Sequence, residues 1–170
     1  MHSHSVSGTM LIVLESSAMN DRLRIPQDGE YFKAIGMAAI AFARLEWDAV
    51  WCCERLQPGY INTIEVQKKT AGKIGNDLRT LFSRVADVAF RSRIEPFADE
   101  FREVVEQRNQ LLHGKPGTAP NGDQRLFSGG FEWSIDAVNA FSDRCVKAGE
   151  PLNTLLYDEL KEPCAIALLP

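Results

Sequence analysis

One long apolar stripe constrains the fold of this chain more than any other feature. Between Glu30 and about Leu56, apolar residues recur at alternating spacings of four and three positions. That spacing keeps one face of an α-helix apolar over about seven turns. Such a helix has to bury its apolar face against other helices, so the stripe predicts a helical bundle. Its members are Tyr31, Ile35, Ala38, Phe42, Leu45, Ala49, Cys52 and Leu56.

Other residues of the same predicted helix indicate what surrounds it. A strip of small residues beside the stripe lets another helix approach closely, and it consists of Gly36, Ala39 and Ala43. Bulky apolar residues also lie outside the stripe, namely Ile40, Trp47 and Trp51. We therefore expect this helix to have neighbours on two sides. Pro58–Gly59 should end it.

A second helix with the same spacing should begin between Thr63 and Thr70 and end near Phe90. Thr70 is a suitable N-cap for the later start. Two glycines within this helix, Gly72 and Gly75, indicate a close helix crossing. The apolar stripe of the helix comprises Ala71, Ile74, Leu78, Leu81, Val85 and Val88.

A third helix should follow, with Pro96 in its first turn, because proline is favoured at that position. It should end at Gly114, since Pro116 lies just beyond and glycine commonly ends a helix. Its buried stripe comprises Ile94, Phe97, Phe101, Val104, Val105, Leu111 and Leu112.

The remaining chain adds a small sheet and more helix. Residues Gly114–Asp123 are rich in Gly and Pro and should form a loop, whereas Gln124–Phe127 and Phe131–Trp133 read as a β-hairpin. Ser134 should cap a fourth helix, Pro151 should interrupt it, and a last helical segment should cover 152–160. The apolar tail at 164–169 needs cover from the body or from a partner chain.

These patterns predict an all-α fold, an antiparallel bundle of about four to five helices with a small β-hairpin before the fourth helix. Residues 1–29 form an N-terminal arm or tail, and residues 30–170 form a single domain. An apolar run within the arm, Met10–Leu14, reads as a short strand or a packing segment. His2 and His4 are a weak candidate for a metal site, and the preferred prediction is that the chain binds no metal and no cofactor.

Charge and cysteine usage narrow the class of protein. The formal net charge is −4, which disfavours a protein that coats nucleic acid by bulk charge. The cysteines form no C-x-x-C pair, zinc pattern or disulfide framework, so reduced thiols in a cytoplasmic protein are expected. They are Cys52, Cys53, Cys145 and Cys164. No apolar run approaches the roughly 20 residues that span a membrane.

The second predicted helix is the basic part of the chain. Between positions 68 and 93, seven cations face only Asp77 and Asp87. They form either a solvated helix face or a track for an RNA backbone. The cations are Lys68, Lys69, Lys73, Arg79, Arg84, Arg91 and Arg93. We take Lys73 and Arg79, together with Lys115, as the candidate substrate-binding residues.

The end of the third helix, Gln107–Gly114, carries the most distinctive chemistry. Arg108 has apolar residues three and four positions away on both sides, so it projects from the apolar face and needs a carboxylate, a partner chain or a bound anion. His113 lies in the last turn, where a histidine cation also stabilises a helix end simply through the helix dipole. A purely structural Arg108 could reach the rim of the bundle or pair with Glu46 or Asp77.

A histidine and a fixed arginine together suit RNA cleavage by the substrate's own 2′-hydroxyl. A base removes the hydroxyl proton, a cation stabilises the phosphorane, and an acid protonates the leaving 5′-oxygen. The arm aside, one chain supplies one histidine, His113, although acid and base are separate roles. A two-fold dimer that joins the ends of the third helix would supply two.

At these residues the chain resembles the HEPN superfamily of helical domains. Arg108, Asn109 and His113 match its R-N-x-x-x-H form, and the segment RNQLLHGKPGT is similar to that of bacterial members. The resemblance implies a helical bundle that dimerises with the motif at the interface. It also implies a metal-independent endoribonuclease, often within a toxin–antitoxin or other defence system and therefore with an antitoxin protein as a possible partner.

Carried over by position, the resemblance makes His113 the acid or base, Arg108 the phosphate contact and Asn109 an orienting residue. One toxin subgroup has a tyrosine, modified by its antitoxin, where this chain has Leu111, so that regulation is not implied. Two alternatives stay open. The chain could be a non-catalytic HEPN-like dimerisation module that binds a nucleotide or RNA, or a purely structural helical protein.

Overall fold

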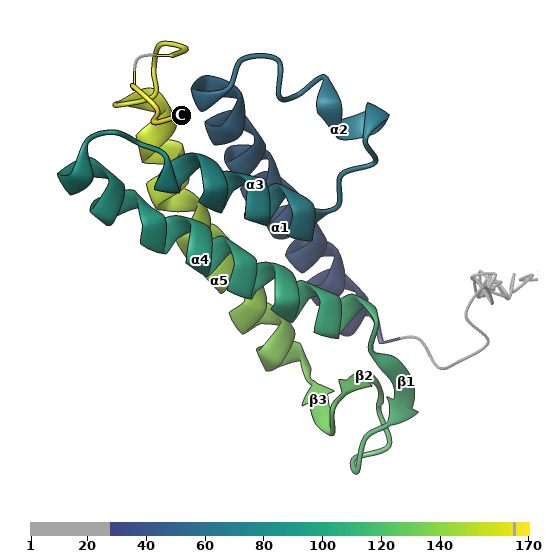
Figure 1. The fold of residues 1–170 in the computed structure, drawn as a ribbon. Coiled ribbons are helices and arrows are strands. Elements are labelled where there is room, and N and C mark those ends of the chain that lie inside the picture. Colours follow the sequence, from purple (N-terminus) through teal and green to yellow (C-terminus); the bar gives the residue numbers. More distant parts are fainter. Residues whose placement is uncertain (1–27, 165) are drawn as a thin grey trace, which may run out of the picture.

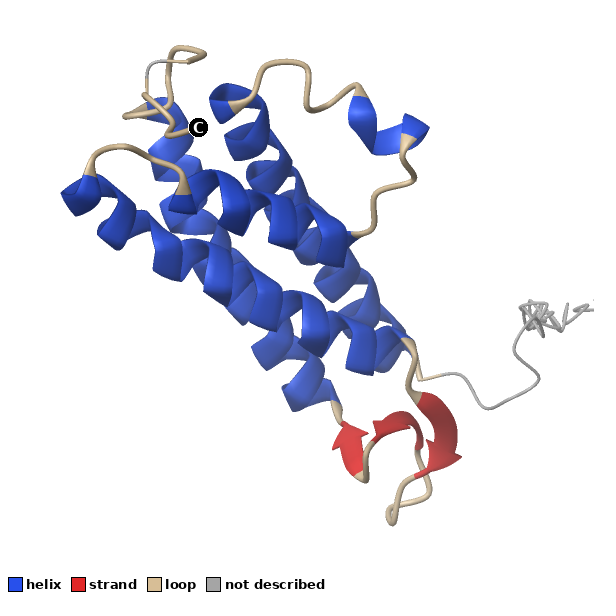
Figure 2. Ribbon diagram, viewed as in Figure 1, coloured by secondary structure: helices blue, strands red, loops and turns tan. Residues whose placement is uncertain are grey.

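The computed structural model describes residues 28–170 except residue 165. Within that range, four long helices pack around one apolar core (Figures 1 and 2). They are α1 (Gly29–Leu56), α3 (Ala71–Ser83), α4 (Val88–Leu112) and α5 (Ile135–Tyr157), and a short α2 (Thr63–Val66) connects α1 to α3. α1 and α4 lie diagonally across the bundle, and α3 and α5 each contact both. The expected mainly helical bundle is confirmed. The arm proposed at 1–29, with His2, His4 and Met10–Leu14, falls almost wholly outside the described residues.

The apolar stripe of α1 faces the core, as its spacing predicts. All of its members are buried except Ile35, which is partly buried. α1 contacts α5 on one side and α3 on the other. The expectation that these neighbours would cover the outlying bulky residues is wrong, because Ile40, Trp47 and Trp51 remain 61%, 49% and 44% exposed among the described residues.

The boundaries predicted for the second and third helices are wrong. α3 ends at Ser83, and α4 begins at Val88 rather than near Pro96, because the Asp87 carboxylate accepts a hydrogen bond from the Phe90 N–H at 2.9 Å and so caps α4. Pro96 therefore lies inside α4. In the same way, α5 runs through Pro151 without interruption. Each proline removes one backbone hydrogen bond, and burial of the flanking apolar residues outweighs that loss.

The small β-region has three strands rather than two. β1 (Lys115–Thr118), β2 (Gln124–Ser128) and β3 (Phe131–Trp133) form an antiparallel sheet in the order β1-β2-β3 at one end of the bundle (Figure 2). The predicted β2–β3 hairpin is confirmed. The predicted loop is wrong at its start, where β1 pairs with β2. A Lys-Pro-Gly-Thr segment shows no alternation of apolar and polar residues, so it carries no strand pattern.

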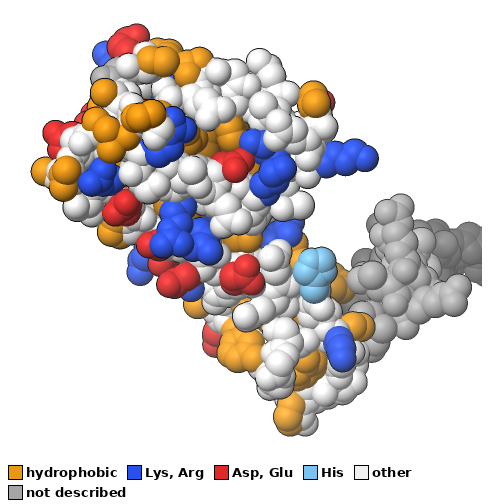
Figure 3. All heavy atoms as spheres, in the orientation of Figure 1, with side chains coloured by type: hydrophobic (Ala, Val, Ile, Leu, Met, Phe, Trp, Pro, Cys, Tyr) orange, Lys and Arg blue, Asp and Glu red, His pale blue; other side chains and the backbone are white. Residues whose placement is uncertain are grey.

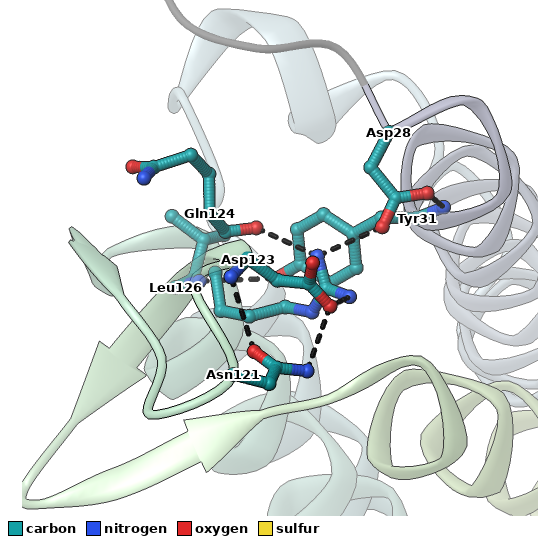
Figure 4. Close-up of polar contacts among 7 residues, drawn as sticks. Asp28, Tyr31, Asn121, Asp123, Gln124 and Leu126 are labelled. Atoms are coloured by element: carbon teal, nitrogen blue, oxygen red, sulfur yellow. Dashed lines mark hydrogen bonds and ion pairs between the residues drawn. The ribbon is translucent and has the colours of Figure 1, made fainter.

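A buried arginine joins this sheet to the start of α1. The Arg125 guanidinium is paired with Asp28 and Asp123 and lies over the Tyr31 ring (Figure 4). The Tyr31 hydroxyl in turn accepts a hydrogen bond from the Leu126 N–H at 3.1 Å. This cluster fixes the sheet beside the end of α4, where the candidate motif lies.

The apolar C-terminal tail is covered by the chain itself. Ile166 and Leu168 pack against the core, and the Ala86 N–H donates to the Ala167 carbonyl at 2.9 Å. The tail therefore gives no support for a dimer, contrary to the expectation that a partner might cover it.

The two glycines of α3 differ in their surroundings, which gives a paired prediction. A Cβ added at Gly75 would lie 2.9 Å from the Arg102 Cγ and 3.3 Å from the Phe101 ring, whereas one at Gly72 would meet only the Thr70 hydroxyl at 4.0 Å. We expect Gly75→Ala to destabilise the fold by about 1–3 kcal/mol through overpacking. Gly72→Ala should stabilise it by up to about 1 kcal/mol. Denaturant unfolding of both variants tests this, and equal stabilities would contradict a close crossing at Gly75.

Candidate functional site

The motif residues lie at the exposed end of α4. Gly72, near the start of α3, lines the same hollow as Val105 and Glu106. α4 continues beyond that point toward the sheet (Figure 1). The last turns of α4, which carry the motif, are therefore not covered by α3.

Arg108 points from α4 toward α1, as its helical position predicts. It is half-buried, and its Cζ lies 5.2 Å from the centre of the Phe42 ring. One Nη donates to the Asn109 side-chain oxygen at 3.1 Å. The Nε atom is buried and has no hydrogen-bond partner among the described residues. A buried donor without a partner is costly, which suggests that another group completes the site.

Arg108 lines a pocket of about 140 Å³ between α1 and α4. At roughly 30 Å³ per water molecule, the pocket has room for four or five waters or one small charged group. It is too small for a drug-sized ligand, whose sites occupy roughly 300–1,000 Å³. The other lining residues are Ala38, Ala39, Phe42, Ala43, Glu46, Leu111, Leu112 and Phe141.

Glu46 is the acid that shares this pocket with Arg108. Burial raises the pKa of the Glu46 carboxyl, and the nearby Arg108 charge partly opposes that rise. The two side chains, both described, form no ion pair within 4.0 Å. The other predicted acid, Asp77, accepts hydrogen bonds from the Tyr60 hydroxyl at 2.9 Å and from Lys69 at 2.8 Å instead.

His113 caps the C-terminus of α4 and its side chain is exposed. Its backbone N–H donates to the Asn109 carbonyl at 2.9 Å, so the structural role expected at a helix end is present. The imidazole is solvent-accessible, as the single pale-blue side chain of Figure 3 shows. Gly114 follows because a Cβ there would lie 3.0 Å from the Leu126 Cβ. This close approach places the sheet directly beside His113.

The three predicted substrate cations do not all gather at this site. Lys115 is exposed in β1, two positions after His113. Lys73 and Arg79 are exposed on α3, and the Arg79 Nε lies 3.3 Å from an Asp99 carboxylate oxygen. The structure therefore brings together Arg108, Asn109 and Glu46, with His113 and Lys115 on the adjoining surface.

The basic segment is not a continuous track for an RNA backbone. Most of its cations make structural contacts. Lys69 pairs with Asp77 and Arg93 with Glu159, while Arg84 and Arg91 donate to backbone carbonyls. The groove between α3 and α4 is also lined by acids, namely Asp99, Glu103 and Glu106. On the face drawn in Figure 3, Lys and Arg side chains are interspersed with Asp and Glu.

Sequence reasoning named Glu46 only as one of two possible partners and did not assign it to the site. A signal was present, because Glu46 continues the strip of Ala39 and Ala43 at helical spacing. The same strip lines the pocket opposite Arg108, so the position of Glu46 follows from the helix geometry of α1.

Glu46 and Glu54 give opposite predictions for stability against pH. Since burial raises the pKa of Glu46 above 4.5, its ionisation costs stability as pH rises, and we expect Glu46→Gln to be more stable than wild type at pH 7 but not at pH 4. Hydrogen bonds from the Gly59 and Ile61 N–H groups lower the pKa of Glu54. Glu54→Gln should therefore be less stable at pH 7, with the difference disappearing below about pH 4. Urea unfolding at both pH values tests this, and a less stable Glu46→Gln at pH 7 would contradict it.

Comparison with known proteins gives no further guide, because no family model, curated protein or solved structure matches the chain. Within the described residues, no helix combines the length and apolar character needed to cross a membrane. The same residues contain no group of three His, Cys, Asp or Glu side chains placed to hold a metal ion.

Proposed function

We propose that this protein is a metal-independent endoribonuclease of HEPN type, which cleaves RNA in a site completed by a second copy of the chain. One observation carries the proposal. The half-buried Arg108 has a buried Nε without a partner, and it lies one helical turn from His113, the histidine of residues 28–170. The resemblance of the R-N-x-x-x-H segment to HEPN ribonucleases supports the same assignment.

The side chains suit the steps of this reaction. The substrate's 2′-oxygen attacks the adjacent phosphorus, its proton passes to one His113, and a bond between O2′ and phosphorus forms. The bond between phosphorus and O5′ then breaks, and the leaving O5′ takes a proton from a second, protonated His113. Arg108 holds the phosphate and stabilises the negative charge of the phosphorane. Asn109, hydrogen-bonded to Arg108, orients the guanidinium.

The direct test is cleavage of a single-stranded RNA in the presence of EDTA. The proposal predicts products with a 2′,3′-cyclic phosphate and a 5′-hydroxyl, since the nucleophile belongs to the substrate. An RNA whose ribose at the cleaved position carries 2′-O-methyl should resist cleavage there. Products with a 5′-phosphate, or cleavage of the methylated position, would overturn the mechanism.

A second candidate is a non-catalytic HEPN-like dimerisation module that binds a nucleotide or RNA at the same residues. The size of the pocket favours it, because about 140 Å³ accommodates one phosphate group beside Arg108. This candidate predicts RNA binding that Arg108→Ala weakens, without cleavage. A role as a toxin or defence component, with an antitoxin protein as partner, belongs to the ribonuclease proposal. It predicts growth arrest on expression that His113→Ala relieves.

A further inference from the structure

The surface beside the Arg108 pocket is apolar, closely shaped and uncovered. Where α3 no longer covers the bundle, α1 exposes Gly36, Ala39 and Ala43, and a Cβ added at Gly36 would meet nothing within 4 Å. Across the pocket, Leu112 of α4 is 44% exposed, although Leu111 beside it is buried. We call this surface, formed by Gly36, Ala39, Ala43 and Leu112, the α1–α4 groove.

We propose that the α1–α4 groove is where a second copy of this chain docks, and that this contact completes the Arg108–His113 site. The inference rests on the proposed function for the meaning of the site, but its geometry stands on the groove. A two-fold dimer buries the same patch of both copies, so the patch has to be complementary to itself.

The groove meets that requirement because it has both a projection and a hollow. Leu112 projects from α4, and the adjacent pocket is walled by the small side chains of Ala39 and Ala43. In a two-fold contact the partner's Leu112 lies over this wall, and the reciprocal contact forms by symmetry. The small residues allow helix axes to approach to about 8 Å, the short end of the usual range.

The same contact brings the chemical groups together. Leu112 lies next to His113 and four residues, about one turn, from Arg108, so an axis beside Leu112 places both motifs in one cleft. Covering the pocket would also bring the partner's polar groups within reach of the Arg108 Nε and the desolvated Glu46 carboxyl.

A second apolar surface on α1 is the competing choice. Trp47 and Trp51 are about half exposed, and they line a hollow toward α5 that also includes Tyr157. This surface lies on a different strip of α1 from Ala39 and Ala43. A two-fold axis through it would leave the two Arg108 side chains on opposite sides of the dimer.

Two glutamate substitutions separate these surfaces. We expect wild type to sediment as a dimer and Ala43→Glu to shift toward monomer by at least tenfold in dissociation constant, because a charge would be buried at the contact. Trp51→Glu, an exposed site on the same helix, should remain dimeric. Circular dichroism and thermal unfolding should show intact folds. A dimeric Ala43→Glu, a monomeric Trp51→Glu or a monomeric wild type would each overturn the inference.

Crosslinking gives a second measurement that does not depend on activity. In a Cys164→Ser background the remaining native cysteines are buried. Ala39→Cys should therefore react with a short bismaleimide to give a covalent dimer, and Trp51→Cys should not. The opposite pattern would place the interface on the other strip. Crosslinking at Ala39 without RNA cleavage leaves the groove intact as an interface and overturns only the ribonuclease proposal, whereas cleavage by a dimeric Ala43→Glu overturns only the groove.

Discussion

Replacing His113 by alanine should lower the rate of RNA cleavage by about 10²–10⁴-fold, the range typical of a lost general acid or base. Because both copies lose the imidazole, neither proton transfer is assisted. The His113 side chain is exposed, so the fold should lose less than about 1 kcal/mol, mainly from the helix-end interaction. Single-turnover cleavage of a labelled RNA measures the rate, and thermal unfolding measures the stability.

Two further variants sharpen this result. Lys115→Ala removes an exposed cation two positions away, and it should weaken RNA binding with a much smaller effect on the cleavage step. Arg108→Lys keeps the charge but loses the planar guanidinium that can bind phosphate through two hydrogen bonds, so it should resemble Arg108→Ala in rate. Full activity of His113→Ala would remove His113 from the mechanism, whatever Arg108 does.

The sequence predicts the bundle well because α1 states its own burial. Its stripe is long and regular, and spacing alone decides which face turns inward. Spacing also places Arg108 on the side of α4 that faces α1. Both predictions need only helix geometry, which a single chain segment determines.

The errors come from features that tertiary structure overrides. Pro96 and Pro151 suggest helix boundaries, but buried residues on either side keep each helix continuous. β1 has no strand pattern of its own, and it is extended because β2 pairs with it. The basic segment misleads for a similar reason, since partners distant in sequence, such as Glu159 for Arg93, take up its charges. None of these contacts can be read from local spacing.

The cluster that holds the sheet shows the same limit and gives the second large prediction. Arg125 is 6% exposed in a strand whose sequence alternates weakly, so nothing local marks it as buried. Its guanidinium lies 2.9 Å from Asp28 and 2.6 Å from Asp123, and 4.7 Å from the centre of the Tyr31 ring. These residues come from the start of α1 and from the turn before β2, which only the folded chain brings together (Figure 4).

Replacing Arg125 by methionine should destabilise the protein by about 3 kcal/mol, the lower end of the range for breaking a buried pair. The lower end applies because both carboxylates remain partly solvated, at 32% and 44% side-chain exposure. Arg79→Met is the matched control, because it removes an exposed pair with Asp99 and should cost at most about 1 kcal/mol. Denaturant unfolding at pH 7 measures both, and a loss under about 1 kcal/mol at Arg125 would contradict a structural role for the cluster.

The pH dependence identifies the cause of that loss. The Tyr31 N–H, and then Arg125, lower the pKa of Asp28 below its usual value of 3.8. The stability from this ionised carboxylate is present above pH 3.8 and is lost as pH falls through the lowered pKa. The difference between wild type and Arg125→Met should therefore be constant near neutral pH and shrink below about pH 4. Since the sheet begins directly after His113, the same substitution should loosen the motif, so RNA cleavage should fall even at temperatures where the variant remains folded.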